Sequence, residues 1–459
     1  MAFLDLRAWI KHLDERGSLY KSSEAADLRY DIPRILEQYD GRKTVVFENV
    51  GDYSPSRVVG GLFGSRTQMA DALGVPTDQL LHYYLQAVEH PIAPVEVSAE
   101  EAPVLEVHDP EVRLDRLPAP WHHEKDSGQY ITAAIAIARD PSSGIQNWSI
   151  HRLQINDARH LGALILPQHL WHIFSTVEAE GKDLPIAFAL GLPPGYLLSS
   201  QAVTEFGVDE AGVGGGLFRQ PLSMVRSPRY GILVPAFAEH LFEGRLLAQK
   251  RAPEGPFGEY PRTYGPKSDK PVIEIDELFH RADPVFQTIL PASNEHMLLG
   301  AIPREAAIYK IVRHVSPTIR DVALTFAGGC RFHAVVSMTP KRAGEAKNVM
   351  LAAFAGAKEI KRVVVVDEDI DISSAQEVEW AIATRVQPDQ DVMIMSDMFG
   401  SGLDPSAREN GQTSKWGIDA TIPLGANRER YEQVKTPHRA TPPAQHPVTS
   451  EEKEEYVGY

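Results

Sequence analysis

The sequence predicts an α+β protein in which a β-rich centre separates two regions of mixed helix and strand. Its 459 residues are long for a single hydrophobic core. Short apolar or alternating segments dominate from residue 131 to residue 275, and strand-like segments alternate with helix-like ones after about residue 290. These observations place an N-terminal α/β domain at 1–105, a central domain at 106–290 and a C-terminal α/β domain at 291–459.

The N-terminal region begins with an amphipathic pattern. Five apolar residues recur at helical spacing and predict a first helix: Phe3, Leu6, Trp9, Ile10 and Leu13. The sequence KTVVFENV at 43–50 predicts a strand, residues 58–65 a glycine-containing loop, and residues 66–73 a short helix. Proline and acidic residues between 91 and 120 suit a linker, so the first domain boundary lies near 105.

The central region consists mostly of short strands and is predicted to form a barrel-like sheet. Its expected strands cover residues 131–138, 149–155, 161–166, 185–191 and 271–275. One helix is expected at 169–179, where the apolar spacing is helical. A glycine cluster at 212–216 lacks the strand-to-helix setting of a dinucleotide-binding turn, so a tight turn or bulge is the favoured interpretation there.

The C-terminal region alternates strands and helices and predicts an α/β layer. The expected strands are residues 297–302, 321–326, 332–338 and 362–366. The expected helices are residues 304–313, 341–356 and 374–384. From residue 437 onward the chain is rich in proline and charge, which indicates a flexible tail or one that lies on a partner.

Composition excludes several classes of protein. A formal net charge of −16 argues against nucleic acid as a partner, because phosphate contacts need clustered lysine and arginine. Cys330 is the single cysteine, which excludes an internal disulfide and a cysteine-based metal cluster. There is no apolar run of the roughly 18 to 20 residues needed to span a bilayer. The N-terminus also lacks the features of a signal peptide, so a cytoplasmic location is expected.

Three short segments of the central region carry side chains of the types that can bind metal ions. In NWSIHR, Asn147, Ser149 and His151 would share one face of a strand, with Arg152 on the other face unless a bulge intervenes. His169 stands where a strand ends and a helix begins, and a helix N-terminus favours anions. Together with Glu210, these residues offer an amide oxygen, an imidazole and a carboxylate, a plausible set for Mn²⁺ or Mg²⁺. From the spacing of these residues alone, three unrelated polar residues are the favoured interpretation over a metal site.

Two glutamates stand close together in a segment rich in glycine and proline. In PEGPFGE, Glu254 and Glu259 are separated by residues that suit neither regular helix nor regular strand. Turns there would bring both carboxylates to one site, where burial and a nearby arginine can make one an acid and the other a permanent base. An exposed acidic turn is the competing interpretation. The adjacent His122 and His123 are interpreted as part of a polar loop.

Taken in order, these segments resemble the UbiD family of reversible decarboxylases, in particular its ferulic-acid-decarboxylase-like branch. The resemblance rests on NWSIHR at 147–152, LILPQHLW at 164–171, VDEAGVGG at 208–215, VPAFAEHLFEG at 234–244 and PEGPFGE at 253–259. DEDIDI at 367–372 and WAIATRVQP at 380–388 extend it over most of the chain. The family implies a carboxy-lyase whose central domain is a split barrel that binds flavin.

The resemblance also implies cofactors and site residues. The cofactor would be prenylated FMN, made by a separate flavin prenyltransferase, with Mn²⁺ or Mg²⁺ joining its phosphate to Asn147, His169 and Glu210. A potassium ion would lie near Trp148, Ser199 and Glu210. The cofactor would be lined by Asn147, Trp148, Ser149, Ile150, His151, Arg152, Gln168, His169 and Glu210, and the catalytic network would be Arg152, Glu254 and Glu259. Glu259 would be the acid that protonates carbon.

The substrate is expected to be an aromatic or heteroaromatic acid, for which indole-3-carboxylate is one choice. Leu299 and Phe354 are expected in its pocket. Aryl-acrylic and hydroxybenzoic acids remain alternatives, as do an FMN oxidoreductase and a non-catalytic flavin-binding protein of the same fold. Family members are homodimers or larger, and the segment NRERYEQV at 427–434 would supply a C-terminal helix for assembly. Two departures stand out: Ala355 occupies the position of an expected lysine, and His151 that of a small residue.

Overall fold

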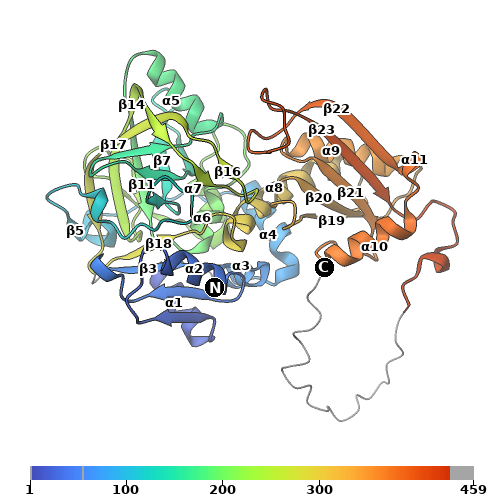
Figure 1. Ribbon diagram of the computed structural model, residues 1–459, viewed down its shortest axis with the longest axis horizontal. Coiled ribbons are helices and arrows are strands. Elements are labelled where there is room, and N and C mark those ends of the chain that lie inside the picture. The colour runs from blue at the N-terminus through green and yellow to red at the C-terminus, as the bar shows by residue number, and fades with distance from the viewer. Residues whose placement is uncertain (1–2, 54–55, 435–459) are drawn as a thin grey trace, which may run out of the picture.

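The computed structural model describes residues 3–53 and 56–434. Figure 1 shows the N-terminal segment in blue beside the central domain in green, with the C-terminal domain in orange on the other side of helix α8. Helix α8 (Asn294–Val315) therefore lies between the two halves of the molecule. The segment from residue 437 onward, predicted as a flexible tail, lies outside the described residues.

The N-terminal domain is a four-stranded sheet with helices packed on it. Its strands, in spatial order, are β1 (Leu19–Ser22), β2 (Thr44–Phe47), β3 (Arg57–Gly60) and β18 (Val285–Thr288). Its helices are α1 (Leu6–Glu15), α2 (Asp31–Tyr39), α3 (Arg66–Leu73) and α4 (Leu80–Glu89). The predicted helix at 66–73 is confirmed. The predicted loop at 58–65 is wrong in its first part, because β3 is paired with β2 and with the distant β18.

The central domain is a nine-stranded sheet. Its longest path runs β6 (Tyr130–Ile131), β9 (Leu153–Ile155), β10 (His160–Ala163), β17 (Ser268–His280), β14 (His240–Glu254), β11 (Leu184–Leu190), β7 (Ile135–Arg139), β8 (Gln146–Ile150), and β5 (Val107–His108) pairs with β17. Strands β8 and β9 stand near opposite ends of this order, yet only His151 and Arg152 join them. Two residues reach roughly 10 Å at most, so the sheet must curl until its ends approach, as in an incomplete barrel.

Helices and smaller sheets complete the central domain. The helices are α5 (His169–Ala179), α6 (Pro194–Ser199) and α7 (Glu210–Phe218). Strands β13 (Leu233–Pro235), β12 (Ser223–Arg226) and β4 (Val95–Glu96) form one small sheet, and β15 (Phe257–Gly258) and β16 (Tyr264–Gly265) form another. The predicted helix at 169–179 is confirmed. The predicted strand at 149–155 is two strands, and the glycine cluster is helix α7, so its interpretation as a turn is wrong.

The C-terminal domain contains a five-stranded sheet in the order β19 (Ile319–Leu324), β20 (His333–Met338), β21 (Arg362–Asp367), β23 (Gln412–Ala420), β22 (Val392–Phe399). Helices α9 (Glu345–Gly356), α10 (Ala375–Arg385) and α11 (Pro388–Asp391) accompany it. The predicted strand at 297–302 is wrong, since these residues belong to α8. The C-terminal helix expected at 427–434 is one 3₁₀ turn, Arg428–Tyr431.

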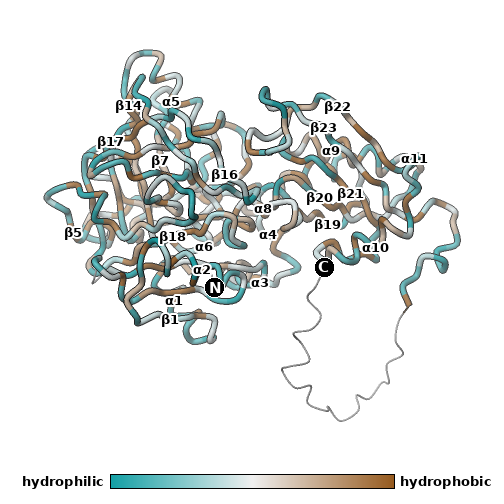
Figure 2. Tube along the Cα trace, in the orientation of Figure 1, coloured by the Kyte–Doolittle hydropathy of each residue, from teal (hydrophilic) through white to brown (hydrophobic). Residues whose placement is uncertain are grey.

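Apolar segments concentrate in the sheets and in the helices that cover them, whereas outer loops are hydrophilic (Figure 2). Strands β7, β11 and β21 are almost wholly buried. Within the described residues, no helix combines the length and apolar character needed to cross a membrane.

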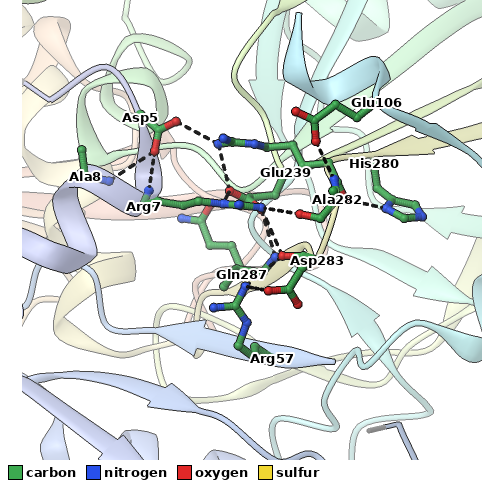
Figure 3. Close-up of polar contacts among 12 residues, drawn as sticks. Asp5, Arg7, Ala8, Arg57, Glu106, Glu239, His280, Ala282, Asp283 and Gln287 are labelled. Atoms are coloured by element: carbon green, nitrogen blue, oxygen red, sulfur yellow. Dashed lines mark hydrogen bonds and ion pairs between the residues drawn. The ribbon is translucent and has the colours of Figure 1, made fainter. Parts of the chain in front are cut away.

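A buried ion-pair cluster fixes the N-terminal helix to the central domain (Figure 3). Arg7, at the start of α1, donates from Nε and Nη2 to the two oxygens of Glu239, at 2.8 Å each. Arg281 donates to Asp5 at 2.8 Å and to Glu239 at 3.3 Å, and the backbone N–H of Val285 donates to Glu239 at 3.0 Å. Glu239 is fully buried. Its charge is therefore compensated by two guanidinium groups and one backbone donor.

Candidate active site

A cavity of about 460 Å³ lies where the central domain meets α8 and the C-terminal domain. This volume is within the usual range for small-molecule sites. All nine residues expected at the cofactor line it: Asn147, Trp148, Ser149, Ile150, His151, Arg152, Gln168, His169 and Glu210. Strand β8 and the residues that link it to β9 supply the first six, so one short segment forms a whole wall.

Glu210 and Asn147 form the polar end of the cavity. Glu210 is the first residue of α7 and is only 2% exposed. It accepts from Asn147 Nδ2 and from the backbone N–H of Trp148, at 2.9 Å each, and its Oε1 lies 4.0 Å from His169 Nδ1. His169 is the first residue of α5, so two helix N-termini meet at this end. Helix N-termini favour anions such as phosphate.

The glycines of α7 allow this helix to approach its neighbours closely. A Cβ at Gly215 would lie 2.2 Å from the carbonyl oxygen of Ile92, and one at Gly216 would lie 2.7 Å from that of Ala87. Only glycine fits at such separations. The glycine cluster therefore serves helix packing, which holds Glu210 in place behind the cavity.

Arg152 stands between the two glutamates of PEGPFGE. Its Nη2 donates to Glu254 Oε2 at 2.7 Å, and its Nη1 donates to Glu259 Oε1. Glu254 ends strand β14 and is fully buried, so this part of the segment is regular strand, contrary to expectation. Glu259 is 8% exposed and lines the cavity. Burial raises the pKa of Glu259, and the charge of Arg152 only partly opposes this.

His151 occupies the cavity wall as a neutral side chain. Burial lowers the pKa of His151 to about 4. Its Nδ1 lies 3.1 Å from the carbonyl oxygen of Leu164, which can only accept, so Nδ1 carries the proton. Its Nε2 therefore accepts from the hydroxyl of Ser149 at 2.8 Å. The ring consequently fixes the direction of the Ser149 hydroxyl.

Two arginines in the cavity were not foreseen from the sequence. Arg304 on α8 and Arg331 before β20 both line it, and neither forms an ion pair with any residue in 3–53 or 56–434. Arg304 donates to the carbonyl oxygen of Gly300 at 3.0 Å, and Arg331 donates to that of Cys330 at 2.9 Å. Arg331 is 6% exposed and lies over the Tyr260 ring at 5.2 Å. Burial and the charge of Arg304 lower the pKa of Arg331 to about 9. The backbone at Gly300 makes room for it, because a Cβ there would lie 1.5 Å from Arg331 Nη2.

His296 lies on the same wall as these arginines. Its Nδ1 accepts from the backbone N–H of Ala292 at 3.1 Å, so the remaining proton is on Nε2. Burial lowers the pKa of His296 to about 3, which keeps the ring neutral and a donor. In the sequence, Arg304 stands in an RE dipeptide on a predicted helix and Arg331 follows GGC, and neither setting indicates a binding role. Their position in a cavity without an ion-pair partner depends on the tertiary structure.

The remaining expected residues are placed as follows. Leu299 on α8 lines the cavity. Phe354 is not among the lining residues; it is buried on α9 below Lys415, whose Nζ lies 5.6 Å from its ring. Ser199 is fully buried and donates to the carbonyl of Tyr196 at 2.9 Å, with Ser200 at the cavity instead.

Family models match nearly the whole chain. The N-terminal, Rift-related and C-terminal domains of 3-octaprenyl-4-hydroxybenzoate carboxy-lyase (UbiD) match residues 10–88, 95–294 and 297–420. An anhydromevalonate phosphate decarboxylase from Methanothermobacter thermautotrophicus is 38% identical over 413 residues, which cover 90% of this chain and 94% of that protein. The chain belongs to the UbiD family.

Solved structures of UbiD-class enzymes share the fold. HmfF from Pelotomaculum thermopropionicum in complex with FMN superposes with a TM-score of 0.92 at 47% identity, covering 94% of this chain and 97% of that one. An evolved dimeric form of HmfF holds prFMN, with a TM-score of 0.88 at 44% identity and coverage of 95% and 97%. Klebsiella pneumoniae 3,4-dihydroxybenzoic acid decarboxylase superposes with a TM-score of 0.89 at 28% identity, covering 96% of this chain and 98% of that one. This chain is accordingly a UbiD-family carboxy-lyase, and the predicted fold class is confirmed.

The polar end of the cavity fits the metal that the UbiD resemblance implies. Asn147 Oδ1 is buried and has no hydrogen-bond partner, so an amide oxygen is free to bind a cation. Glu210 adds a carboxylate and His169 an imidazole, all within one end of the cavity. No cluster of three or more His, Cys, Asp or Glu side chains suited to a metal occurs in the described ranges. A mixed shell completed by phosphate oxygens is therefore the arrangement that these residues permit.

Proposed function

We propose that this enzyme decarboxylates a flat aromatic or heteroaromatic acid that carries a second anionic group. The observation that carries this proposal is the Arg304–Arg331 pair, which lies in the same cavity as Arg152 and Glu259. Arg331 is buried and Arg304 is half-buried, and each donates only to a backbone carbonyl group. Guanidinium charges held in this way without a carboxylate partner are costly unless a ligand compensates them. The neutral Nε2–H of His296 adds a donor of the kind that carboxylates accept.

The second anion separates the substrate candidates. Indole-3-carboxylate has one carboxylate, and that group must face the reacting centre, so the arginine pair would remain uncompensated. A heteroaromatic dicarboxylic acid places one carboxylate at each end of a flat ring. The name of the Methanothermobacter relative, anhydromevalonate phosphate decarboxylase, also includes a phosphate, which is a second anionic group. Aryl-acrylic and hydroxybenzoic monoacids fit the arginine pair less well for the same reason.

We also assign the cofactor as prenylated FMN, supported by the FMN and prFMN held by HmfF. Asn147, His169 and Glu210 would bind Mn²⁺ or Mg²⁺ on its phosphate, where two helix N-termini add favourable dipoles. Potassium is proposed near Trp148, Ser199 and Glu210. The Ser199 hydroxyl donates its proton to the carbonyl oxygen of Tyr196, which leaves the lone pairs of the hydroxyl oxygen for a cation. When bound, the prenylated flavin supplies an electron sink for the pair left by CO₂ loss.

The chain's own residues orient the acid and supply its proton. Arg304, Arg331 and His296 hold the remote anion, which fixes the ring in one direction along the cavity. Glu259 lies at the cavity surface, and burial raises its pKa, which favours the protonated form that can donate to carbon. Arg152 positions that carboxyl group, and Glu254 balances the arginine's charge from behind. Overall, one proton enters the product for each CO₂ released.

The proposed partners follow from the cofactor and from the family. A flavin prenyltransferase would supply the prenylated FMN, and the chain would assemble as a homodimer or larger oligomer. The evolved HmfF described above is a dimeric form.

The test is coexpression with a flavin prenyltransferase, followed by absorbance spectra and CO₂ release from paired furan or pyrrole monocarboxylic and dicarboxylic acids. Arg304→Gln and Arg331→Gln should each raise the KM for a dicarboxylic acid by about 10- to 100-fold, because a hydrogen bond to a charged group contributes ~1.5–3 kcal/mol. Arg408→Gln, at an exposed ion pair with Asp397, is the control and should change nothing.

Three results would contradict the proposal in different ways. Equal turnover of monocarboxylic and dicarboxylic acids by all variants would remove the second anion from the substrate. Ordinary FMN with NAD(P)H turnover would indicate an oxidoreductase. Absence of any flavin after coexpression would favour a binding protein of the same fold.

A further inference from the structure

Residues 122–130 pack against the turn that carries the two glutamates. The backbone N–H of Ser127 donates to the carbonyl of Pro256 at 3.0 Å. The buried carboxylate of Asp126 accepts from the backbone N–H of Gly258 at 2.9 Å. This loop includes the WHHEKD motif, whose histidines were interpreted as merely polar. Its contacts hold the chain on both sides of Phe257 and so fix the path from Glu254 to Glu259.

Tyr130 is the residue of this segment that contacts the network formed by Glu254, Arg152 and Glu259. It is fully buried, and its hydroxyl lies 3.1 Å from Glu254 Oε1. The same hydroxyl lies 3.0 Å from Gln154 Oε1 and 3.0 Å from Ser127 Oγ. Arg152 Nη2 binds the other oxygen of Glu254. Each oxygen of this buried carboxylate therefore has one side-chain neighbour that can donate.

The single proton of the Tyr130 hydroxyl links its direction to the charge of Glu254. If Tyr130 donates to Glu254, the carboxylate is ionised and has a donor on each oxygen. If Tyr130 donates to Gln154, Glu254 must carry a proton itself to hydrogen-bond with the phenol oxygen. Burial and the nearby Glu254 raise the pKa of Tyr130, so it stays a phenol and remains able to donate.

The charge of Glu254 decides how strongly Arg152 acts on Glu259. With Glu254 ionised, the guanidinium charge is shared between two carboxyl groups. With Glu254 neutral, Arg152 would pair with Glu259 alone and would favour its ionised form, which cannot donate a proton. The titratable groups that face Glu254 are Tyr130 from β6, Arg152 from the β8–β9 link and Glu259 beyond β15. Strands β10 and β17 present Gly162 and Ser268 to it, which are neutral.

We propose that Tyr130 is a positioning residue for the proton donor: its hydroxyl keeps Glu254 ionised, and this leaves Glu259 able to hold the proton that decarboxylation consumes. The inference rests on the proposed function of Glu259. Tyr130 does not line the cavity, so it acts through Glu254 and Arg152 without touching substrate.

The direct test is a pH titration of the full chain, purified without cofactor, by infrared difference spectroscopy. The C=O band of a protonated carboxyl group reports each buried glutamate, with Glu254→Gln and Glu259→Gln to assign the bands. In Tyr130→Phe, Glu254 should take up a proton at a pH about one unit higher, because a hydrogen bond to a charged group is lost. Glu259 should lose its proton at lower pH than in the unchanged chain.

Ser127→Ala and Tyr196→Phe complete the design. Ser127 is exposed, so its alanine variant will fold. Its hydroxyl also lies 2.9 Å from Gln154 Oε1, and its loss leaves the contact between Tyr130 and Glu254 in place, so Ser127→Ala should shift both titrations less than Tyr130→Phe does. Tyr196 is also fully buried, but its hydroxyl has no hydrogen-bond partner, so Tyr196→Phe should leave both titrations unchanged.

Activity of the loaded enzyme gives the second measurement. In Tyr130→Phe the alkaline limb of the decarboxylation rate should move to lower pH by about one unit. Unchanged titration of both glutamates in Tyr130→Phe and Ser127→Ala would overturn the inference. A shift at Glu254 with an unmoved rate profile would overturn it as well. If no acid is decarboxylated by any chain, the infrared titration still decides the role of Tyr130 separately from the proposed function.

Discussion

Glu239 and Glu259 are both glutamates bound to arginine in the central domain, yet their surroundings differ. Glu239 is fully buried and accepts from Arg7, Arg281 and a backbone N–H (Figure 3). Glu259 is bound by Arg152 and also faces the cavity. The first carboxylate has donors on both oxygens and no access to a ligand. The second lines the cavity, where it can exchange a proton with a ligand, and burial raises its pKa.

This difference separates a structural ion pair from a chemical one. A carboxylate with every oxygen bound to cationic donors holds its charge and ties two segments together. A carboxyl group that shares one arginine with a second carboxylate can take up a proton more easily, because the second carboxylate still balances the charge of the arginine. The number of compensating cations, more than the burial of the group, distinguishes the two sites.

The largest effect is expected at the cavity. Glu259→Gln removes the proposed acid and should lower the decarboxylation rate by roughly 10²- to 10⁴-fold, while the thermal midpoint and bound flavin stay near those of the unchanged enzyme. Rate measurements under saturating substrate and a flavin absorbance spectrum check this. A turnover number within a factor of two of the unchanged enzyme would remove Glu259 from the mechanism.

The reverse pattern is expected at the structural cluster. Glu239→Gln leaves the largely buried Arg281 and the partly exposed Arg7 with insufficient negative charge. This should lower the free energy of unfolding by about 3 kcal/mol, the lower end for a broken buried pair, because solvent reaches Arg7. Decarboxylation by the folded fraction should be preserved, since Glu239 is not at the cavity. Denaturant unfolding and specific activity at low temperature measure both quantities. Normal stability with lost activity would mean that the two sites are not separate.

Glu295 offers an intermediate case, because it is buried without an arginine. It accepts from the backbone N–H groups of Gly61 and Leu62, at 2.9 Å each, and burial raises its pKa to about 8 from 4.5. The folded state therefore binds a proton more tightly than the unfolded chain. This contribution to stability is complete below about pH 4.5 and is lost as the pH rises through about 8.

Glu295→Gln should remove this loss, because the amide does not titrate. The amide keeps one of the two acceptors and loses the other, which lowers stability at every pH without adding a pH dependence. The thermal midpoint of the variant should fall less between about pH 4.5 and about pH 8 than that of the unchanged chain. Thermal unfolding at several pH values in this window measures the difference. Parallel curves for the two proteins would show that Glu295 is ionised throughout.

The sequence predicted elements whose pattern is local. The helices at 66–73 and 169–179 are confirmed, because apolar spacing and a capping residue or strand end define them without help from distant residues. The apolar run from Met297 to Ile302 predicts a strand but belongs to α8, because a short apolar run does not distinguish a strand from a buried helix. Helix α7 was missed because four of its nine residues are glycine, and only its close contact with Ile92 and Ala87 explains them.

The site could be anticipated only in part. Arg152, Glu254 and Glu259 were expected together from the family resemblance, and their contacts depend on curling of the sheet between β8 and β9. Arg304 and Arg331 carry no mark in the sequence that separates them from surface arginines. Their importance comes from burial in a cavity, which no local pattern encodes.

Helix α8 has 22 residues, which correspond to a rod of about 33 Å. Its first residues are bound by Asp40, Gly61 and Leu62 of the N-terminal domain. The first three or so turns of the same rod carry His296, Leu299 and Arg304, and the helix also packs on β19 and α9. A rod fixed at one end transmits a small tilt as a displacement that grows along its length. Substitutions at Asp40, outside the cavity, should therefore alter which acids the enzyme selects.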